Sequence, residues 1–293
     1  MIPHRLPHLA QRLFNRPLAI LPDKAEVVMA VLADRLGVAR LFRADGSAAA
    51  LDMEVLGPGS SDPARNRPFE MVGPVAVIPI EGTLVHKLGC IHPYSGMTGY
   101  DGIRAMFASA WDDPDVRAIV LDIDSPGGEV SGCFDLVDQI YAARQTGEKP
   151  IWAILDEGAY SAAYAIASAA TRITVPRTGG TGSVGVIALH TDLSKALTAQ
   201  GVTVTVITYG AHKADGIETE PLSDEVRARF QADVDAMGDL FVATVARNRG
   251  LTPAAVKATQ ALTYLGDAGT KIGFADAVLS PDAAMSELLG SLR

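Results

Sequence analysis

Two kinds of hydrophobic run alternate along the chain from residue 72 onward. Short, nearly all-apolar runs that are rich in β-branched residues, such as "VAVIPIEG", "VRAIVLDIDSPGG" and "PIWAILDE", predict strands. Between them, "GIRAMFASAWDD", "GCFDLVDQIYAAR" and "SAAYAIASAA" have the apolar spacing of helices. Strands that are apolar throughout are buried on both faces, so this order predicts an α/β fold with a mostly parallel sheet covered by helices.

The pattern continues in the second half of the chain. "RITVP", "GSVGVIALHT" and "VTVTVITYG" predict further strands, and "DLSKALTAQG" predicts a short helix. Residues 222–250 predict one long helix, because their apolar side chains recur at a period close to 3.6. We expect a buried stripe along this helix made of Val226, Phe230, Val234, Met237, Phe241 and Val245.

The first 70 residues have a different character. Residues 22–38 carry apolar side chains at helical spacing and predict one amphipathic helix. Residues 57–68, "GPGSSDPARNRP", combine chain breakers with polar residues and predict a linker. The sequence therefore predicts a helical N-terminal extension with a linker over residues 1–70, and a catalytic-sized domain over residues 71–293.

Composition narrows the function classes. The 293 residues are 48% hydrophobic and 20% charged, as in a globular protein, and the net charge of −9 argues against a nucleic-acid-binding surface. The two cysteines, Cys90 and Cys133, have neither CxxC nor zinc spacing, so we expect reduced thiols in a cytoplasmic protein. We expect no membrane anchor, because no run of about 18 apolar residues is present. Without a ligand cluster or a phosphate loop, we expect no metal or organic cofactor.

Two segments carry candidate chemistry. In "DSPGG", Gly127 and Gly128 follow a buried strand and let backbone N–H groups approach a ligand, as in an oxyanion hole; an ordinary strand-to-helix turn is the alternative. In "DEGAYSAAYAIASAA", Ser161 begins an alanine-rich helix, where it is either a nucleophile or an N-cap.

A nucleophilic serine needs a base. His212 is the one histidine suited to a serine–histidine pair, but no acidic residue near it in sequence has an obvious orienting role. Its neighbour Lys213 follows an apolar run and lies between two glycines. A lysine in a desolvated pocket loses its proton more easily and can act as a base; the alternative is an ordinary surface lysine.

The segments "LDIDSPGG", "DEGAYSAAYAIASAA", "GGTGSVGVI" and "GAHKADG", in this order, resemble the signal peptide peptidase A family of serine–lysine peptidases. The closing "LTYLGDAGTKIGFADAV" resembles the family's ending, and the resemblance covers residues 72–279. It implies the fold of the Clp protease proteolytic subunit and the crotonases, a repeated ββα superhelix.

The resemblance also implies roles for individual residues. Ser161 matches the nucleophile, Lys213 the general base, and Ser183 in "TGSVGV" the serine that holds the lysine amine. Gly128 and Ala162 match the oxyanion donors. The run after Lys213, "ADGIETEPLS", departs from the Asn-Pro-Phe-like run of the family, which affects the loop beside the base.

The N-terminal extension without an anchor resembles the phage and prophage head-assembly branch, whose members cleave scaffold or head proteins. This implies a polypeptide substrate, a homo-oligomer, and a location in the host cytoplasm or the phage prohead. Two alternatives remain open. One is crotonase-like acyl-CoA chemistry on the same scaffold, and the other is an assembly component with a degenerate site.

Overall fold

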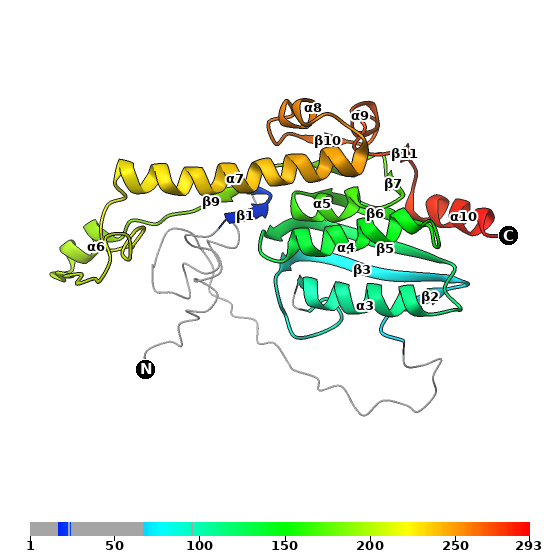
Figure 1. Cartoon of the computed structure of the whole chain (residues 1–293), viewed down its shortest axis with the longest axis horizontal. Coiled ribbons are helices and arrows are strands. Elements are labelled where there is room, and N and C mark those ends of the chain that lie inside the picture. The colour runs from blue at the N-terminus through cyan, green and yellow to red at the C-terminus, as the bar shows by residue number, and fades with distance from the viewer. Residues whose placement is uncertain (1–16, 23, 25–66, 95) are drawn as a thin grey trace, which may run out of the picture.

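The computed structural model describes residues 17–22, 24, 67–94 and 96–293 (Figure 1). The predicted helix over residues 22–38 and the predicted linker over residues 57–68 fall almost entirely outside the described residues. The domain boundary near residue 70 therefore stays a prediction. One short piece of the N-terminal region, β1 (Pro17–Ile20), is described and pairs with the sheet of the body.

The body is built on one mixed sheet whose centre is parallel, as the sequence predicts. Its central strands β3 (Val75–Val85), β5 (Ala118–Glu129), β6 (Ile151–Tyr160) and β7 (Arg172–Val175) pair side by side in parallel. They form here because their side chains are apolar on both faces of the sheet. The remaining described strands are shorter: β2 (Glu70–Val72), β4 (Met97–Gly99), β8 (Gly180–Gly182), β9 (Ile187–Ala188), β10 (Thr263–Leu265) and β11 (Ala277–Val278).

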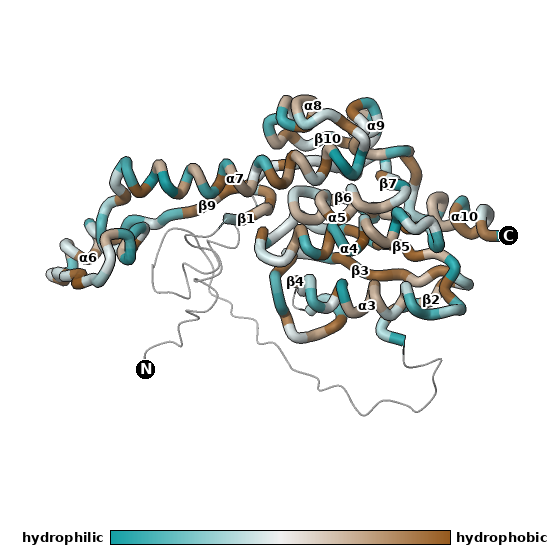
Figure 2. Tube along the Cα trace, in the orientation of Figure 1, coloured by the Kyte–Doolittle hydropathy of each residue, from teal (hydrophilic) through white to brown (hydrophobic). Residues whose placement is uncertain are grey.

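Helices cover both faces of this sheet. The main core lies between the sheet and α3 (Tyr100–Asp112), α4 (Cys133–Thr146) and α5 (Ala162–Ser168). A smaller cluster on the other face packs against α10 (Pro281–Ser291). In Figure 2, β3 is largely brown, which marks it as hydrophobic. The other described helices are α6 (Ser194–Ala199), α7 (Asp224–Arg249), α8 (Pro253–Lys257) and α9 (Asp267–Lys271).

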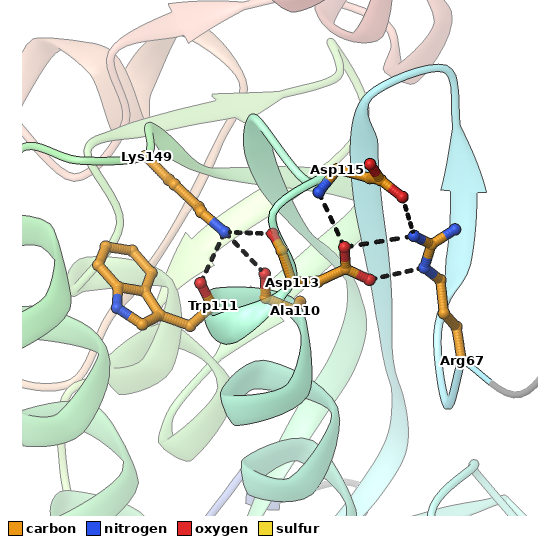
Figure 3. Close-up of polar contacts among 6 residues, drawn as sticks. All are labelled: Arg67, Ala110, Trp111, Asp113, Asp115 and Lys149. Carbon is orange, nitrogen blue, oxygen red and sulfur yellow. Dashed lines mark hydrogen bonds and ion pairs between the residues drawn. The ribbon is translucent and has the colours of Figure 1, made fainter. Parts of the chain in front are cut away.

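The C-terminal end of α3 is held by side chains from distant parts of the chain (Figure 3). Nζ of Lys149 donates to the carbonyl oxygens of Ala110, Trp111 and Asp113 at 3.2, 2.6 and 2.8 Å. Arg67 donates to the carboxylates of Asp113 and Asp115. Carbonyls in the last turn of a helix have no partner within the helix, so these contacts tie the end of α3 to the residues that precede β2 and β6.

The long helix α7 departs from the sequence prediction. Only its C-terminal half is buried: Phe241 and Val245 lie in the core, whereas Phe230 and Val234 remain half-exposed. The predicted buried stripe is therefore wrong for the N-terminal half. In Figure 1 that half projects beyond the sheet together with α6, and we call residues 189–223 the arm.

The predicted strand over residues 202–210 is also wrong. This part of the arm has no strand pairing, and Ile207 and Tyr209 are 92% and 102% exposed. A β-branched run becomes a strand only where a neighbouring strand accepts its hydrogen bonds, and the described part of the chain supplies none here.

Candidate active site

Ser161 lies where β6 ends and α5 begins, in a backbone conformation that is rare for serine. Its φ and ψ are 54° and −121°, and its side chain makes no capping hydrogen bond to α5. The Ser161 N–H donates to the carbonyl of Gly182 at 2.9 Å, and Oγ lies 3.4 Å from the carbonyl oxygen of Gly185. A positive φ costs free energy in a residue other than glycine, so the surrounding contacts must stabilise this conformation of Ser161. The structure therefore gives no support to the N-cap interpretation.

The glycine segment of β5 lies directly beside Ser161. The sequence predicts a turn at Gly127 and Gly128, but β5 continues through both, with a φ of 99° at Gly127. A Cβ added to Gly127 would lie 2.9 Å from Cβ of Ser161, and one added to Gly128 would overlap the backbone of Leu84. Glycine is required at these positions because two backbone segments and a serine side chain meet there.

The two other expected members of the site are near as well. Ala162 is the first residue of α5, whose first N–H groups have no acceptor within the helix. Ser183 is 6% exposed, has a φ of 54°, and directly follows Gly182, which accepts the Ser161 N–H. The predicted strand "GSVGVIALHT" is interrupted here, because residues 183–186 wrap around Ser161 between β8 and β9.

Lys213 is not brought to Ser161 within the described chain. It is exposed and lies in a turn of the arm, where its N–H donates to the carbonyl of Gly210 at 3.2 Å. The turn is tied to the N-terminal part of α7 by the ion pair of Asp215 with Arg229 at 2.7 Å. In contrast, α5 contacts the C-terminal end of α7 through Asn248, about 28 Å along the helix from Arg229.

The structure brings an acidic side chain to His212, a contact that the sequence analysis did not expect. Its Nδ1 lies 3.4 Å from Asp215, three residues later. Both side chains belong to the arm, so this pair does not reach Ser161 in the described structure.

The sequence reasoning missed an acidic cavity of about 460 Å³ at the carboxyl ends of the central strands. Its carboxylates come from Glu81, Asp122, Asp124 and Asp156, and it adjoins Ser125 in the glycine segment. Burial, followed by the charges of Asp156 and Glu81, raises the pKa of Asp122 to about 6. All four residues lie near the same edge of a parallel sheet, which is the signal that could have indicated this cavity.

The acidic cavity bears on the acyl-CoA alternative. Crotonase-like chemistry needs carboxylates near the oxyanion hole, and this cavity places four of them beside the glycine segment. Among the described residues, no cluster of histidine, cysteine and carboxylate side chains has an arrangement that could hold a metal ion.

Comparison with known proteins decides the family. The profile of Peptidase family S49 matches residues 143–290, which contain Ser161, Ser183 and Lys213. The chain belongs to peptidase family S49. This confirms the family resemblance drawn from the four sequence motifs.

Two phage proteins are similar to this S49 chain over 98% of its length. One is the Head-tail preconnector protein GP5 of Enterobacteria phage P21, with 40% identity, and the other is the Capsid assembly protease C of Escherichia phage lambda, with 38% identity. The chain spans 58% and 66% of these two proteins. Protease 4 of Salmonella typhi is 27% identical over 75% of the chain and 35% of that protein. None of the described helices is long and apolar enough to cross a membrane.

Proposed function

We propose that this S49 chain is a serine endopeptidase in which Ser161 is the nucleophile. One observation carries the proposal: Ser161 lies at a strained strand-to-helix junction, its hydroxyl does not cap the helix, and its Cβ lies beside Gly127 in the glycine segment of β5. A strained backbone at such a position is typical of functional sites. The family match supports the same chemistry.

The proposed reaction proceeds through an acyl-enzyme. Neutral Lys213, oriented by Ser183, takes the Ser161 proton as Oγ attacks the scissile carbonyl, and the N–H groups of Gly128 and Ala162 stabilise the oxyanion. Lys213 then gives the proton to the leaving amine. A water molecule, deprotonated by Lys213, releases the acyl group and restores Ser161.

We further propose that Lys213 reaches Ser161 of a neighbouring copy in a homo-oligomer. The support is the position of Lys213 on an arm that projects from the body. The exposed apolar side chains of this arm, including Ile207 and Tyr209, need a partner surface. Burial between two copies would also desolvate the amine, which favours its neutral form.

The biological setting we propose is head assembly of a tailed phage or prophage, with a phage head or scaffold polypeptide as the substrate. The names of the two phage relatives matched over 98% of the chain support it, since one is a capsid assembly protease and the other a head-tail preconnector protein. The chain would then act in the host cytoplasm or within the prohead. The acidic net charge gives no support for nucleic acid as a partner.

The test compares wild type with Ser161→Ala and Lys213→Ala, each incubated with unfolded casein at pH 8.5 and analysed by intact mass. We expect cleavage by wild type alone, with all three proteins forming the same oligomer. Removing a nucleophile or its base commonly lowers the rate by more than about 1,000-fold.

Mixing the two inactive variants tests the origin of the base. If Lys213 acts on the neighbouring copy, a mixed oligomer contains sites with both residues, and cleavage returns to about a quarter to a half of the wild-type rate. If the cleavage rate of the mixture stays at background, both residues act within one chain. Absence of cleavage by wild type on casein and on its own head proteins would favour the assembly-component alternative.

A further inference from the structure

The strand β1 fills the space between β5 and β9 beside Ser161, and we call this space the groove. It pairs antiparallel on one side with residues 127–129 of β5 and on the other with Ile187 and Ala188 of β9. Leu18, Ala19 and Ile20 are all at least 96% buried. In Figure 1, β1 lies next to β9 below α7. A peptide bound between two strands in this way is held by main-chain hydrogen bonds on both edges.

The register of β1 places one carbonyl at the proposed catalytic centre. The Leu21 N–H donates to the carbonyl of Pro126 at 3.0 Å. Opposed residues alternate between hydrogen-bonded and non-hydrogen-bonded pairs, so Ala19 and Gly128, two positions along, are also a hydrogen-bonded pair. The Gly128 N–H therefore faces the carbonyl oxygen of Ala19.

Ser161 lies at the same point. A Cβ added to Gly127 would overlap the carbonyl oxygen of Ala19 and would lie 2.9 Å from Cβ of Ser161. The Ala19 carbonyl is thus next to the serine and opposite the N–H group expected to stabilise an oxyanion. This is the location that a scissile carbonyl would occupy.

The side chains of β1 also fit the groove. Leu18 and Ile20 pack against Ile187 and Leu189, whereas the methyl group of Ala19 points to the opposite side and joins the main core. A larger side chain at position 19 would have to displace fully buried neighbours.

The chain that follows β1 leads to the acidic cavity. Leu21 and Lys24 line this cavity together with its four carboxylates. The charge of Lys24 is complementary to them, so β1 matches the groove in main chain and side chains, and Lys24 matches the cavity in charge.

We propose that the segment from Pro17 to Lys24 is an internal ligand of the peptide-binding groove and restrains cleavage of other polypeptides. This inference rests on the proposed peptidase function of the same site. Another polypeptide can bind only after β1 leaves, so its apparent affinity is reduced by the fraction of molecules with an empty groove.

The first experiment unseats β1 in the full chain. Ala19→Asp places a charge in the core and should expel the strand, while Lys24→Glu leaves the core intact and sets a negative charge against the acidic cavity. With minor states commonly populated at about 0.1–10%, we expect kcat/KM for fluorescein-labelled unfolded casein to rise about 10- to 1,000-fold for Ala19→Asp. Lys24→Glu should give a smaller rise, and Lys24→Arg should match wild type.

A purely structural role of β1 predicts a different outcome. If β1 only completes the sheet, both variants lose stability and their kcat/KM stays equal to wild type or falls. A rise in neither variant, with cleavage by wild type intact, overturns the restraint and leaves the peptidase function standing.

A binding experiment separates failure of the inference from failure of the proposed function. A fluorescent peptide with the sequence of residues 16–24 is titrated into Ser161→Ala and into the double variant Ser161→Ala, Ala19→Asp. This binding measurement does not depend on catalysis. We expect at least about tenfold tighter binding to the double variant. A peptide of scrambled sequence should bind neither protein, and equal binding of the correct peptide to both overturns the inference even if no variant is active.

Discussion

Asp122 gives the structure a measurable pH dependence. It lies in β5 below the acidic cavity, where burial and then the charges of Asp156 and Glu81 raise its pKa from 3.8 to about 6. The folded state thus holds this proton more tightly than the unfolded chain does. Its destabilising effect is absent below pH 4, grows as the pH rises to 6, and is constant above that.

The size of the effect follows from the shift. A difference of about two pKa units corresponds to about 3 kcal/mol. Asp122 is only partly buried, so solvent screening reduces this to about 1–2 kcal/mol. The Asp122→Asn variant keeps the shape of the side chain and removes its charge. We therefore expect it to raise the free energy of unfolding by about 1–2 kcal/mol above pH 7 and by little at pH 4.

Urea unfolding followed by tryptophan fluorescence at one-unit steps from pH 4 to 8 measures this difference. Trp152 lies in β6, the strand next to β5, so its emission reports on the relevant part of the sheet. Asp124→Asn is the matched control, because Asp124 lines the same cavity and is exposed. A stabilisation by Asp122→Asn that is the same at every pH, or a loss of stability above pH 7, would refute the reasoning.

Three further substitutions test other contacts. Lys149→Met removes three hydrogen bonds to the end of α3 and should lower the free energy of unfolding by about 1–3 kcal/mol in urea titrations; an unchanged midpoint would contradict it. Asn248→Ala removes the buried hydrogen bond to Ser168 of α5 at 2.9 Å and should lower the free energy of unfolding by about 1–2 kcal/mol. Relative to wild type, amide hydrogen exchange should become faster in α5 and change less in α10. Gly127→Ala adds a methyl group at a φ of 99°, where Ala19 and Ser161 meet, so casein cleavage should fall at least about tenfold. Cleavage by this variant at the wild-type rate would show that the glycine segment accommodates a methyl group at position 127.

Much of the body could be predicted because its signals are local. β3, β5 and β6 are apolar runs long enough to be recognised alone, and α4 and α5 follow them at helical spacing. Ser161 and Ser183 could be proposed from motifs, and in the structure Ser183 directly follows Gly182, whose carbonyl accepts the Ser161 N–H.

The features that could not be predicted depend on partners distant in sequence or absent from the chain. β1 is only four residues long, and its partner strands lie more than about a hundred residues away, so "PLAI" carries no periodic signal of its own. The run over residues 202–210 has the composition of a strand, but composition does not say whether a pairing edge exists. The acidic cavity joins carboxylates from three separate strands.

The sequence distance between β1 and its partners also sets a time order for folding. Paired residues of β3, β5 and β6 are roughly 30 to 45 positions apart in the sequence, whereas Ala19 and Gly128 are roughly 110 positions apart. Closing the longer loop is slower, so we expect the central sheet to form before β1 docks. A newly made chain would then pass through a stage in which the groove beside Ser161 is built but still empty. For that interval, the groove would be open to whichever extended polypeptide reaches it first.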